Sequence, residues 1–110
     1  MKICLVSGAY RAPSQWEVAS NIETARQAAG RLCRRGIFPI TPHLNTAYFE
    51  SLQPDDFWLK GYLEILRRCD MIYVLANYRT SSGALAELAE AKRLGLQVVF
   101  EEEENNASVR

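Results

Sequence analysis

The chain has 110 residues, 48% of them hydrophobic and 24% charged, and its 13 basic residues balance its 13 acidic ones. A chain of this length suits one domain with a modest core. The balanced charge argues against general nucleic-acid binding through bulk charge. No apolar run is long enough for a membrane span, and Ser7 and Gly8 end the first apolar run too early for a signal peptide.

The number and spacing of the cysteines indicate the redox state of the cellular compartment in which the protein works. Cys4, Cys33 and Cys69 are odd in number and far apart in the chain. This usage predicts buried thiols in a reducing compartment, and it is not typical of a disulfide framework or a metal site. We therefore expect a cytoplasmic protein that does not bind membranes, and no motif calls for a metal or a cofactor.

The first half of the chain predicts two strands and a helix. Residues 2–6 are apolar and stop at a turn, as in a buried strand. Ser20 and Glu23 fit a capping box, which predicts a helix from there to about Arg35, stopped by Gly36. Residues 37–40 read as a second strand, which Pro39 restricts to the edge of a sheet because proline lacks a donor.

The second half continues the alternation. Residues 41–54 form an irregular, aromatic stretch, and residues 59–69 predict a helix. The uncharged residues 71–76 predict a central strand that is covered on both faces. Ser81 or Ser82 begins a helix that Gly95 ends, and residues 96–100 form a last strand. Residues 101–110 are acidic and polar, and they predict an exposed tail.

Strands that alternate with helices predict a three-layer α/β/α sandwich with a parallel sheet of four or five strands. The domain spans residues 1–100. We expect five side chains to be buried in the sheet: Leu5, Ile72, Val74, Val98 and Val99. Ligands of such sheets bind at the carboxyl ends of the strands, so residues 7–11, 41–43 and 77–81 should converge on one crevice.

Glu87 is the candidate catalytic residue. With roughly 100° per residue, it falls within the apolar arc of the last helix, between Ala91 and Leu94. The start of that helix, at Ser81–Gly83, can hold an anion. A carboxylate on an inward face one turn further on is a candidate catalytic group, whereas a solvated glutamate that complements the helix dipole is the alternative.

Several short motifs follow one another in a characteristic order: Ser7-Gly8-Ala9-Tyr10-Arg11, Asn21-Ile22, Pro39-Ile40-Thr41-Pro42-His43, Arg68-Cys69-Asp70, and Ser81-Ser82-Gly83 followed by Glu87. This order resembles the nucleoside 2-deoxyribosyltransferase-like superfamily, and within it the small DUF4406-type proteins of bacteria and phages. The resemblance covers residue 2 to about residue 100. It implies a Rossmann- or flavodoxin-like sheet and chemistry at the N-glycosidic bond of nucleosides or nucleoside 5′-monophosphates.

The resemblance also implies roles for individual residues. Glu87 would attack the anomeric carbon, and Ser81 would contact a 5′-phosphate. The residues that would bind substrate beside them are Ser7, Gly8, Tyr10, Arg11, Ser82 and Gly83. His43 could touch a base or a phosphate, although a hydrogen bond within the loop explains it equally well. The base would lie toward the aromatic residues of the 41–54 loop.

One position departs from the family pattern. The family's enzymes carry an aspartate on the preceding helix, where this chain has Tyr62; Asp55, Asp56 or His43 could substitute for it. Two functions therefore stay open: an N-glycosidase or deoxyribosyltransferase, and a non-catalytic nucleotide-binding module. A phosphate-binding or signalling domain is a third, although the chain lacks the aspartate cluster of phosphotransfer receivers. We also expect a homodimer or a higher homo-oligomer.

Overall fold

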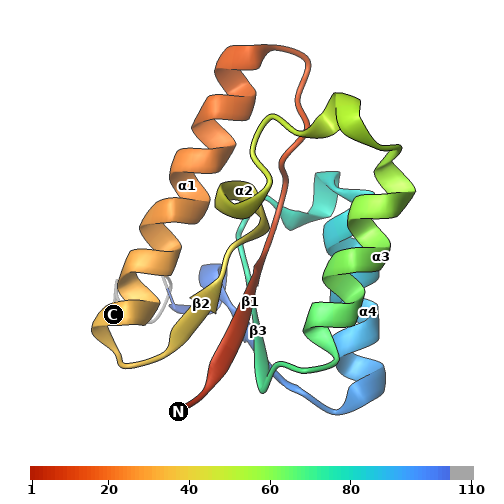
Figure 1. Cartoon of the computed structure of the whole chain (residues 1–110). Coiled ribbons are helices and arrows are strands. Elements are labelled where there is room, and N and C mark those ends of the chain that lie inside the picture. Colours follow the sequence, from red (N-terminus) through yellow and green to blue (C-terminus); the bar gives the residue numbers. More distant parts are fainter. Residues whose placement is uncertain (105–110) are drawn as a thin grey trace.

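The computed structural model describes residues 1–104, and Figure 1 shows them with the carboxyl ends of the strands uppermost. The elements in chain order are β1 (Ile3–Ser7), α1 (Gln15–Arg34), β2 (Phe38–Ile40), α2 (Pro42–Asn45), the 3-10 turn η1 (Glu50–Leu52), α3 (Asp55–Leu66), β3 (Met71–Val74), the 3-10 turn η2 (Tyr78–Thr80), α4 (Ser82–Leu94) and β4 (Gln97–Phe100). Residues 101–104 add a helical turn. The rest of the expected tail, residues 105–110, lies outside the described residues.

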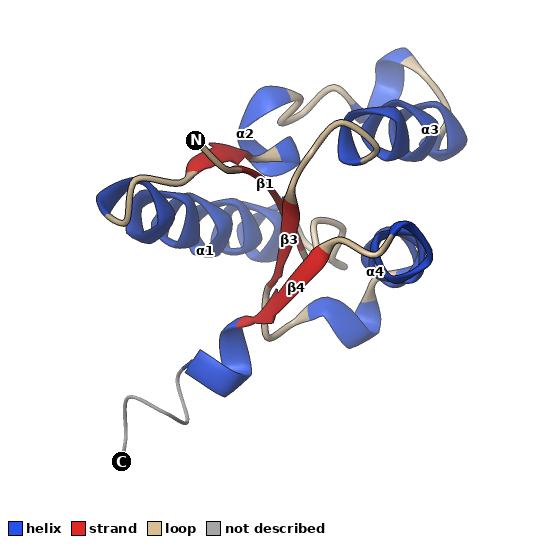
Figure 2. Cartoon of the chain, turned by 90° about the horizontal axis from the view of Figure 1, so that it is seen from below, coloured by secondary structure: helices blue, strands red, loops and turns tan. Residues whose placement is uncertain are grey.

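The four strands form a parallel sheet in the order β2-β1-β3-β4, which confirms the expected α/β/α sandwich. Figure 2 looks along the sheet, with α1 on one face and α3 and α4 on the other. The strand that contains Pro39 lies at the edge, as its missing donor requires. All four residues of β3 are buried, as expected for a central strand.

Strand side chains alternate between two cores. Cys4 and Val6 of β1 pack on the α1 side, and Leu5 packs on the side of α3 and α4. The same alternation directs Ser7 to the α4 side, where it meets Glu87. Ser7 is thus the last inward position of β1 and the first residue of the site.

The N-terminus of α1 lies six residues before the expected one. Ser14 accepts from the Glu17 N–H, and the Glu17 carboxylate accepts from the Ser14 N–H, so this pair forms the capping box. The prediction of a start at Ser20 was wrong because Ser14 and Glu17 have the same spacing one and a half turns earlier. Gly36 follows the helix with φ 75°, as expected of a left-handed stop.

Four smaller expectations need correction. Helix α3 begins at Asp55 instead of residue 59, directly after Pro54. Cys33 is exposed, whereas the other two cysteines are buried. Val98 and Val99 are only partly buried, because β4 forms an edge of the sheet.

The fourth correction concerns the acidic segment 101–104, which was expected to be exposed. Glu101 is 7% exposed; it accepts from the Ala76 N–H at 2.8 Å and pairs with Arg31 at 2.7 Å. Glu104 pairs with Arg35 at 2.9 Å. The first turn after β4 is therefore fastened to α1 and to the end of β3.

Candidate active site

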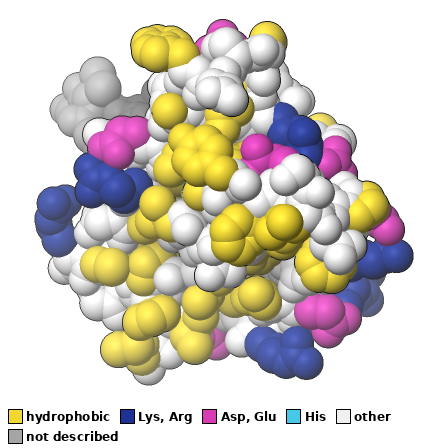
Figure 3. Space-filling view, turned by 45° about the horizontal axis from the view of Figure 1, so that its top comes forward, with side chains coloured by type: hydrophobic (Ala, Val, Ile, Leu, Met, Phe, Trp, Pro, Cys, Tyr) yellow, Lys and Arg dark blue, Asp and Glu magenta, His cyan; other side chains and the backbone are white. Residues whose placement is uncertain are grey.

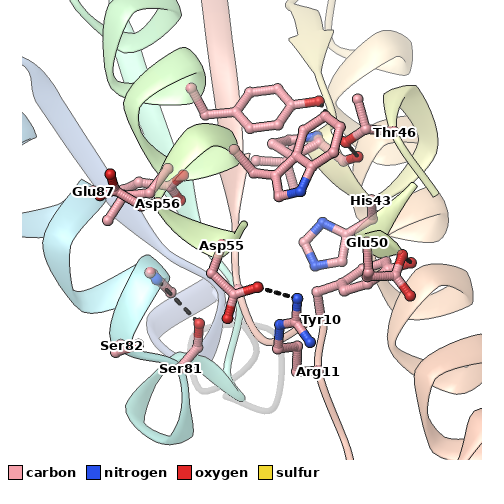
Figure 4. A pocket seen from close by; sticks show the side chains of 18 of the residues that line it. Tyr10, Arg11, His43, Thr46, Glu50, Asp55, Asp56, Ser81, Ser82 and Glu87 are labelled. Atoms are coloured by element: carbon pink, nitrogen blue, oxygen red, sulfur yellow. Dashed lines mark hydrogen bonds and ion pairs between the residues drawn. The ribbon is translucent and has the colours of Figure 1, made fainter. Parts of the chain in front are cut away.

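A pocket of about 520 Å³ opens at the carboxyl ends of the strands. The three expected segments all contribute to it, and so does the first half of α3. The side chains that carry its chemistry are Tyr10, Arg11, His43, Glu50, Asp55, Asp56, Trp58, Tyr62, Ser81, Ser82 and Glu87, most of them labelled in Figure 4. A space-filling view of this end shows hydrophobic side chains interspersed with acidic and basic ones (Figure 3).

Glu87 lies in the pocket wall and is 8% exposed. Its Oε1 accepts a hydrogen bond of 2.6 Å from the Ser7 hydroxyl. Burial raises the pKa of Glu87 from 4.5 to about 7, and the hydrogen bond from Ser7 opposes part of that rise. The helix projection therefore placed this carboxylate correctly, and the alternative of a solvated glutamate is wrong.

The N-terminus of α4 borders the same pocket. The Ser81 hydroxyl accepts from the Ala84 N–H at 3.1 Å and so caps the helix. The N–H groups of Ser82 and Gly83 have no acceptor among residues 1–104, as is usual for the first turn of a helix. A Cβ on Gly83 would meet only the Ser81 hydroxyl, at 3.9 Å, so the space beside this turn is open.

Arg11 reaches across the mouth of the pocket to Asp55, as Figure 4 shows. Both side chains are more than half exposed, so this ion pair is screened by solvent. The adjacent Asp56 pairs with Lys60, one turn further along α3, at 2.9 Å. Arg11 therefore already has an acidic partner in the free protein.

Tyr10 joins the first loop to the irregular stretch after α2. Its hydroxyl donates to Glu50 Oε1 at 2.6 Å and accepts from the Tyr48 N–H at 2.7 Å. Burial and the acidic partner raise the pKa of Tyr10 to about 12. Tyr48 has φ 63°, a left-handed conformation that is uncommon for a tyrosine and that its bond to Tyr10 helps to hold.

His43 is 3% exposed and lies beside Tyr10, with their rings edge to face. Its Nε2 lies 2.9 Å from the carbonyl oxygen of Ala9, to which it donates. Nδ1 is buried and has no hydrogen-bond partner in the described part of the chain. Burial lowers the pKa of His43, so the ring is neutral at pH 7.

Tyr62 lies at the position where the sequence resemblance led us to expect an aspartate. Its hydroxyl accepts from Asn45 Nδ2 at 3.0 Å and lies 2.9 Å from the Thr46 hydroxyl, which in turn lies 3.3 Å from the Pro42 carbonyl oxygen. If Thr46 donates to that carbonyl, Tyr62 donates to Thr46, and its proton is then engaged within the protein.

Gly8 permits the close approach of β1 and β3 beneath the pocket. A Cβ at this position would lie 2.6 Å from Leu75 Cδ1 and 2.8 Å from Asn77 Oδ1. Asn77 uses the same oxygen to accept from the Ala9 N–H at 2.9 Å. The glycine thus positions the loop that carries Tyr10 and Arg11.

The structure brings together all the expected site residues. Seven line the pocket beside Glu87, and Ser7 reaches that carboxylate from behind. Glu50 was not expected in the site. Trp58, which is aromatic enough to stack a base, reaches the pocket because α3 starts early. The aromatic residues of the 41–54 loop, Tyr48 and Phe49, are not among the lining residues, and the base contact expected there stays a prediction.

Neither metal ligation nor a membrane span is evident in residues 1–104. No group of three or more His, Cys, Asp or Glu side chains there could hold a metal ion. No helix among them is both long and apolar enough to cross a membrane.

Asp70 accepts from the Ile3 N–H at 2.8 Å, which gives this motif residue a structural role at the opposite end of the sheet.

Two solved structures have a similar fold. One is the 2-deoxyribosyltransferase of the psychrotolerant bacterium Bacillus psychrosaccharolyticus, with a TM-score of 0.64 and 18% identity over 89% of this chain and 70% of that one. The other is the 2-deoxyribosyltransferase of Leishmania mexicana, with a TM-score of 0.61 and 19% identity over 91% of this chain and 63% of that one. At 18–19% identity, this structural similarity shows a shared fold and nothing about shared activity.

A search of curated proteins found no match. A family model, described as a domain of unknown function, DUF7768, matches residues 2–101. The match spans the whole sheet and every residue of the pocket described above. The chain therefore belongs to the DUF7768 family.

Proposed function

We propose that the protein cleaves the N-glycosidic bond of a nucleoside or nucleoside 5′-monophosphate, by hydrolysis or by transfer of the sugar, with Glu87 as the nucleophile. The observation that carries this proposal is the buried Glu87 carboxylate in the pocket wall. One oxygen accepts from Ser7, and the other has no partner among residues 1–104. A carboxylate so placed can attack an anomeric carbon and stabilise the positive charge that develops there.

The N-terminus of α4 supports an anionic subsite. The free N–H groups of Ser82 and Gly83 and the positive end of the helix dipole favour an anion beside them. Arg11 could contribute if a phosphate displaced Asp55 from it. The sugar would then lie toward Glu87, and the base toward Trp58 of α3.

A non-catalytic nucleotide-binding module is the second candidate function, and Tyr62 favours it. Tyr62 stands where the resemblance to the deoxyribosyltransferase-like enzymes implies an aspartate, and its hydroxyl is already engaged with Asn45 and Thr46. A protein without that acid would bind a nucleotide and leave the bond intact. We also propose that the chain is related to DUF4406-type proteins and that it works in the cytoplasm.

The test is a panel of ribo- and deoxyribonucleosides and their 5′-monophosphates, assayed for free base by chromatography. The catalytic proposal expects base release by the wild type and a loss of at least a hundredfold in Glu87→Gln, because the amide cannot attack. Glu23→Gln is the matched control, since Glu23 is an exposed carboxylate on the opposite face of the sheet. Binding without base release by the wild type would favour the module.

We also propose that the chain forms a homodimer. Several large apolar side chains near the pocket are exposed, and they would suit a self-complementary interface: Tyr48, Phe49, Leu52 and Phe57. Light scattering at micromolar concentration should then give about twice the mass of one chain. A strictly monomeric mass would refute the dimer.

A further inference from the structure

Apart from the helix start at Ser82 and Gly83, the charged side chains of the pocket argue against a phosphorylated substrate. Four carboxylates line it: Glu50, Asp55, Asp56 and Glu87. Arg11 is the one lysine or arginine among the lining residues of the described chain, and Asp55 already pairs with it. Even with Lys60 counted beside Asp56, the acidic groups exceed the basic ones. Such a cavity attracts a cation and repels a dianion.

Apart from the nucleophile Glu87, the pocket side chains that could protonate a leaving group are already engaged. A neutral base that departs from a sugar takes the electron pair of the C1′–N bond and needs a proton from a general acid. The hydroxyl of Tyr62 is engaged with Thr46 and Asn45, and His43 donates its single proton to Ala9. Asp55 and Asp56 are held in ion pairs.

We propose that the substrate of this site is a nucleoside whose glycosidic nitrogen carries a positive charge, as in an N-ribosyl pyridinium without a 5′-phosphate. The proposal rests on the proposed function and names its substrate class. A cationic base accounts for both features, because the carboxylates attract it and because it leaves as a neutral molecule that needs no proton.

The chemical step balances without a co-reactant other than water. A Glu87 oxygen forms a bond to C1′ while the C1′–N bond breaks. The electron pair of the broken C1′–N bond stays on the ring nitrogen and neutralises its positive charge. Water then adds to C1′, the ester bond to Glu87 breaks, and the carboxylate is regenerated. The products are the neutral pyridine, the free sugar and one proton.

His43 is an independent sign of a ligand. The residue is only 3% exposed although it lines the pocket, and no group in residues 1–104 donates a hydrogen bond to its Nδ1. Buried polar atoms without partners are rare and are concentrated at functional sites. Nδ1 itself is shielded from solvent in the free protein, so a ribose hydroxyl could donate to it only if the pocket wall moved on binding.

Binding of a cation should also activate the nucleophile. The pKa of Glu87 in the free protein is about 7, so a large fraction of the carboxyl group is protonated at pH 6. A positive charge next to it favours the ionised form. The other titratable or charged groups that line the pocket are Tyr10, Arg11, His43, Glu50, Asp55, Asp56 and Tyr62. Cation binding at pH 6 should therefore release a proton, and Glu87→Gln should abolish that release.

The experiment compares four probes on the wild type. They are nicotinamide riboside, its uncharged dihydro form, nicotinamide mononucleotide and a set of neutral ribo- and deoxyribonucleosides. We expect a kcat/KM for nicotinamide riboside at least tenfold above those of the neutral and phosphorylated probes. Calorimetry on Glu87→Gln, which cannot turn the probes over, should show at least tenfold tighter binding of nicotinamide riboside than of its dihydro form.

A variant with one pocket carboxylate fewer separates the attraction of the pocket for a cationic substrate from the intrinsic reactivity of that substrate. Asp56→Asn removes one pocket carboxylate and should lower kcat/KM for nicotinamide riboside several-fold more than it lowers kcat/KM for a neutral nucleoside. Glu23→Gln should change neither. Equal or faster turnover of neutral nucleosides would overturn the substrate class and leave the proposed function standing. Absence of base release from every probe would overturn both.

Discussion

Replacement of Glu87 by glutamine should change the pH dependence of stability in a defined way. The glutamine keeps an oxygen that can accept from Ser7 and removes only the titration. In the folded protein the pKa of Glu87 is about 7, against 4.5 for a free side chain. The native state therefore holds a proton between these pH values that the unfolded chain has released.

The sign follows from this difference in proton binding. Stability falls with pH wherever the native state binds more protons than the unfolded state. The contribution of Glu87 is thus fully present below pH 4.5, is lost as the pH rises to about 7, and is constant above. A shift of about 2.5 pKa units at about 1.4 kcal/mol each gives a loss of roughly 3 kcal/mol, and the 8% exposure of Glu87 leaves little solvent screening to reduce it.

Urea unfolding of both proteins between pH 4 and pH 8 would measure this contribution. Other carboxylates titrate in the same range, but they cancel in the difference between wild type and Glu87→Gln. We expect the wild type to lose roughly 3 kcal/mol relative to the variant between pH 4.5 and pH 7. A difference that is constant over this range, or that rises with pH in favour of the wild type, would refute the description of Glu87 as a desolvated carboxyl group.

Three further substitutions test the packing and the polar contacts of the fold by urea unfolding. Gly8→Ala should destabilise the fold by about 1–3 kcal/mol, because its Cβ would lie 2.6 Å from Leu75; an unchanged midpoint would contradict that packing. Gly83→Ala should stabilise α4 by up to about 1 kcal/mol while weakening any ligand that approaches the helix start, and unaltered ligand affinity would show that the ligand lies elsewhere. Glu101→Ala should cost about 2 kcal/mol because it removes a buried carboxylate and leaves the Ala76 N–H and Arg31 without their acceptor, whereas the exposed Glu103→Ala should cost little; equal effects would argue against the buried turn.

The sheet and its central strand could be predicted from the sequence because they depend on local patterns. Uncharged residues at Met71–Val74 and the proline of β2 determine which strand is central and which lies at an edge. The convergence of the loops follows from parallel topology alone. Glu87 was found because a helix projection needs only spacing.

Other features depend on contacts between distant residues. Two segments fit a capping box, and only the structure shows that Ser14 begins α1. The acidic run after β4 looked solvated because its buried partners, Arg31 and the Ala76 N–H, come from elements far apart in the chain. The bonding of Tyr62 to Thr46 likewise became visible only when α2 and α3 were placed side by side.

The central claim is that Glu87 forms a covalent bond to the sugar, and trapping the intermediate tests it most directly. A 2-deoxy-2-fluoro nucleoside slows the breakdown of a glycosyl ester, because fluorine at C2 destabilises the positive charge that develops at C1′. Rapid quenching followed by peptide mass spectrometry would then locate any adduct. We predict one sugar on the peptide that contains Glu87, and none on Glu87→Gln. Base release by the wild type with the sugar attached elsewhere, or with undiminished release by Glu87→Gln, would contradict the account.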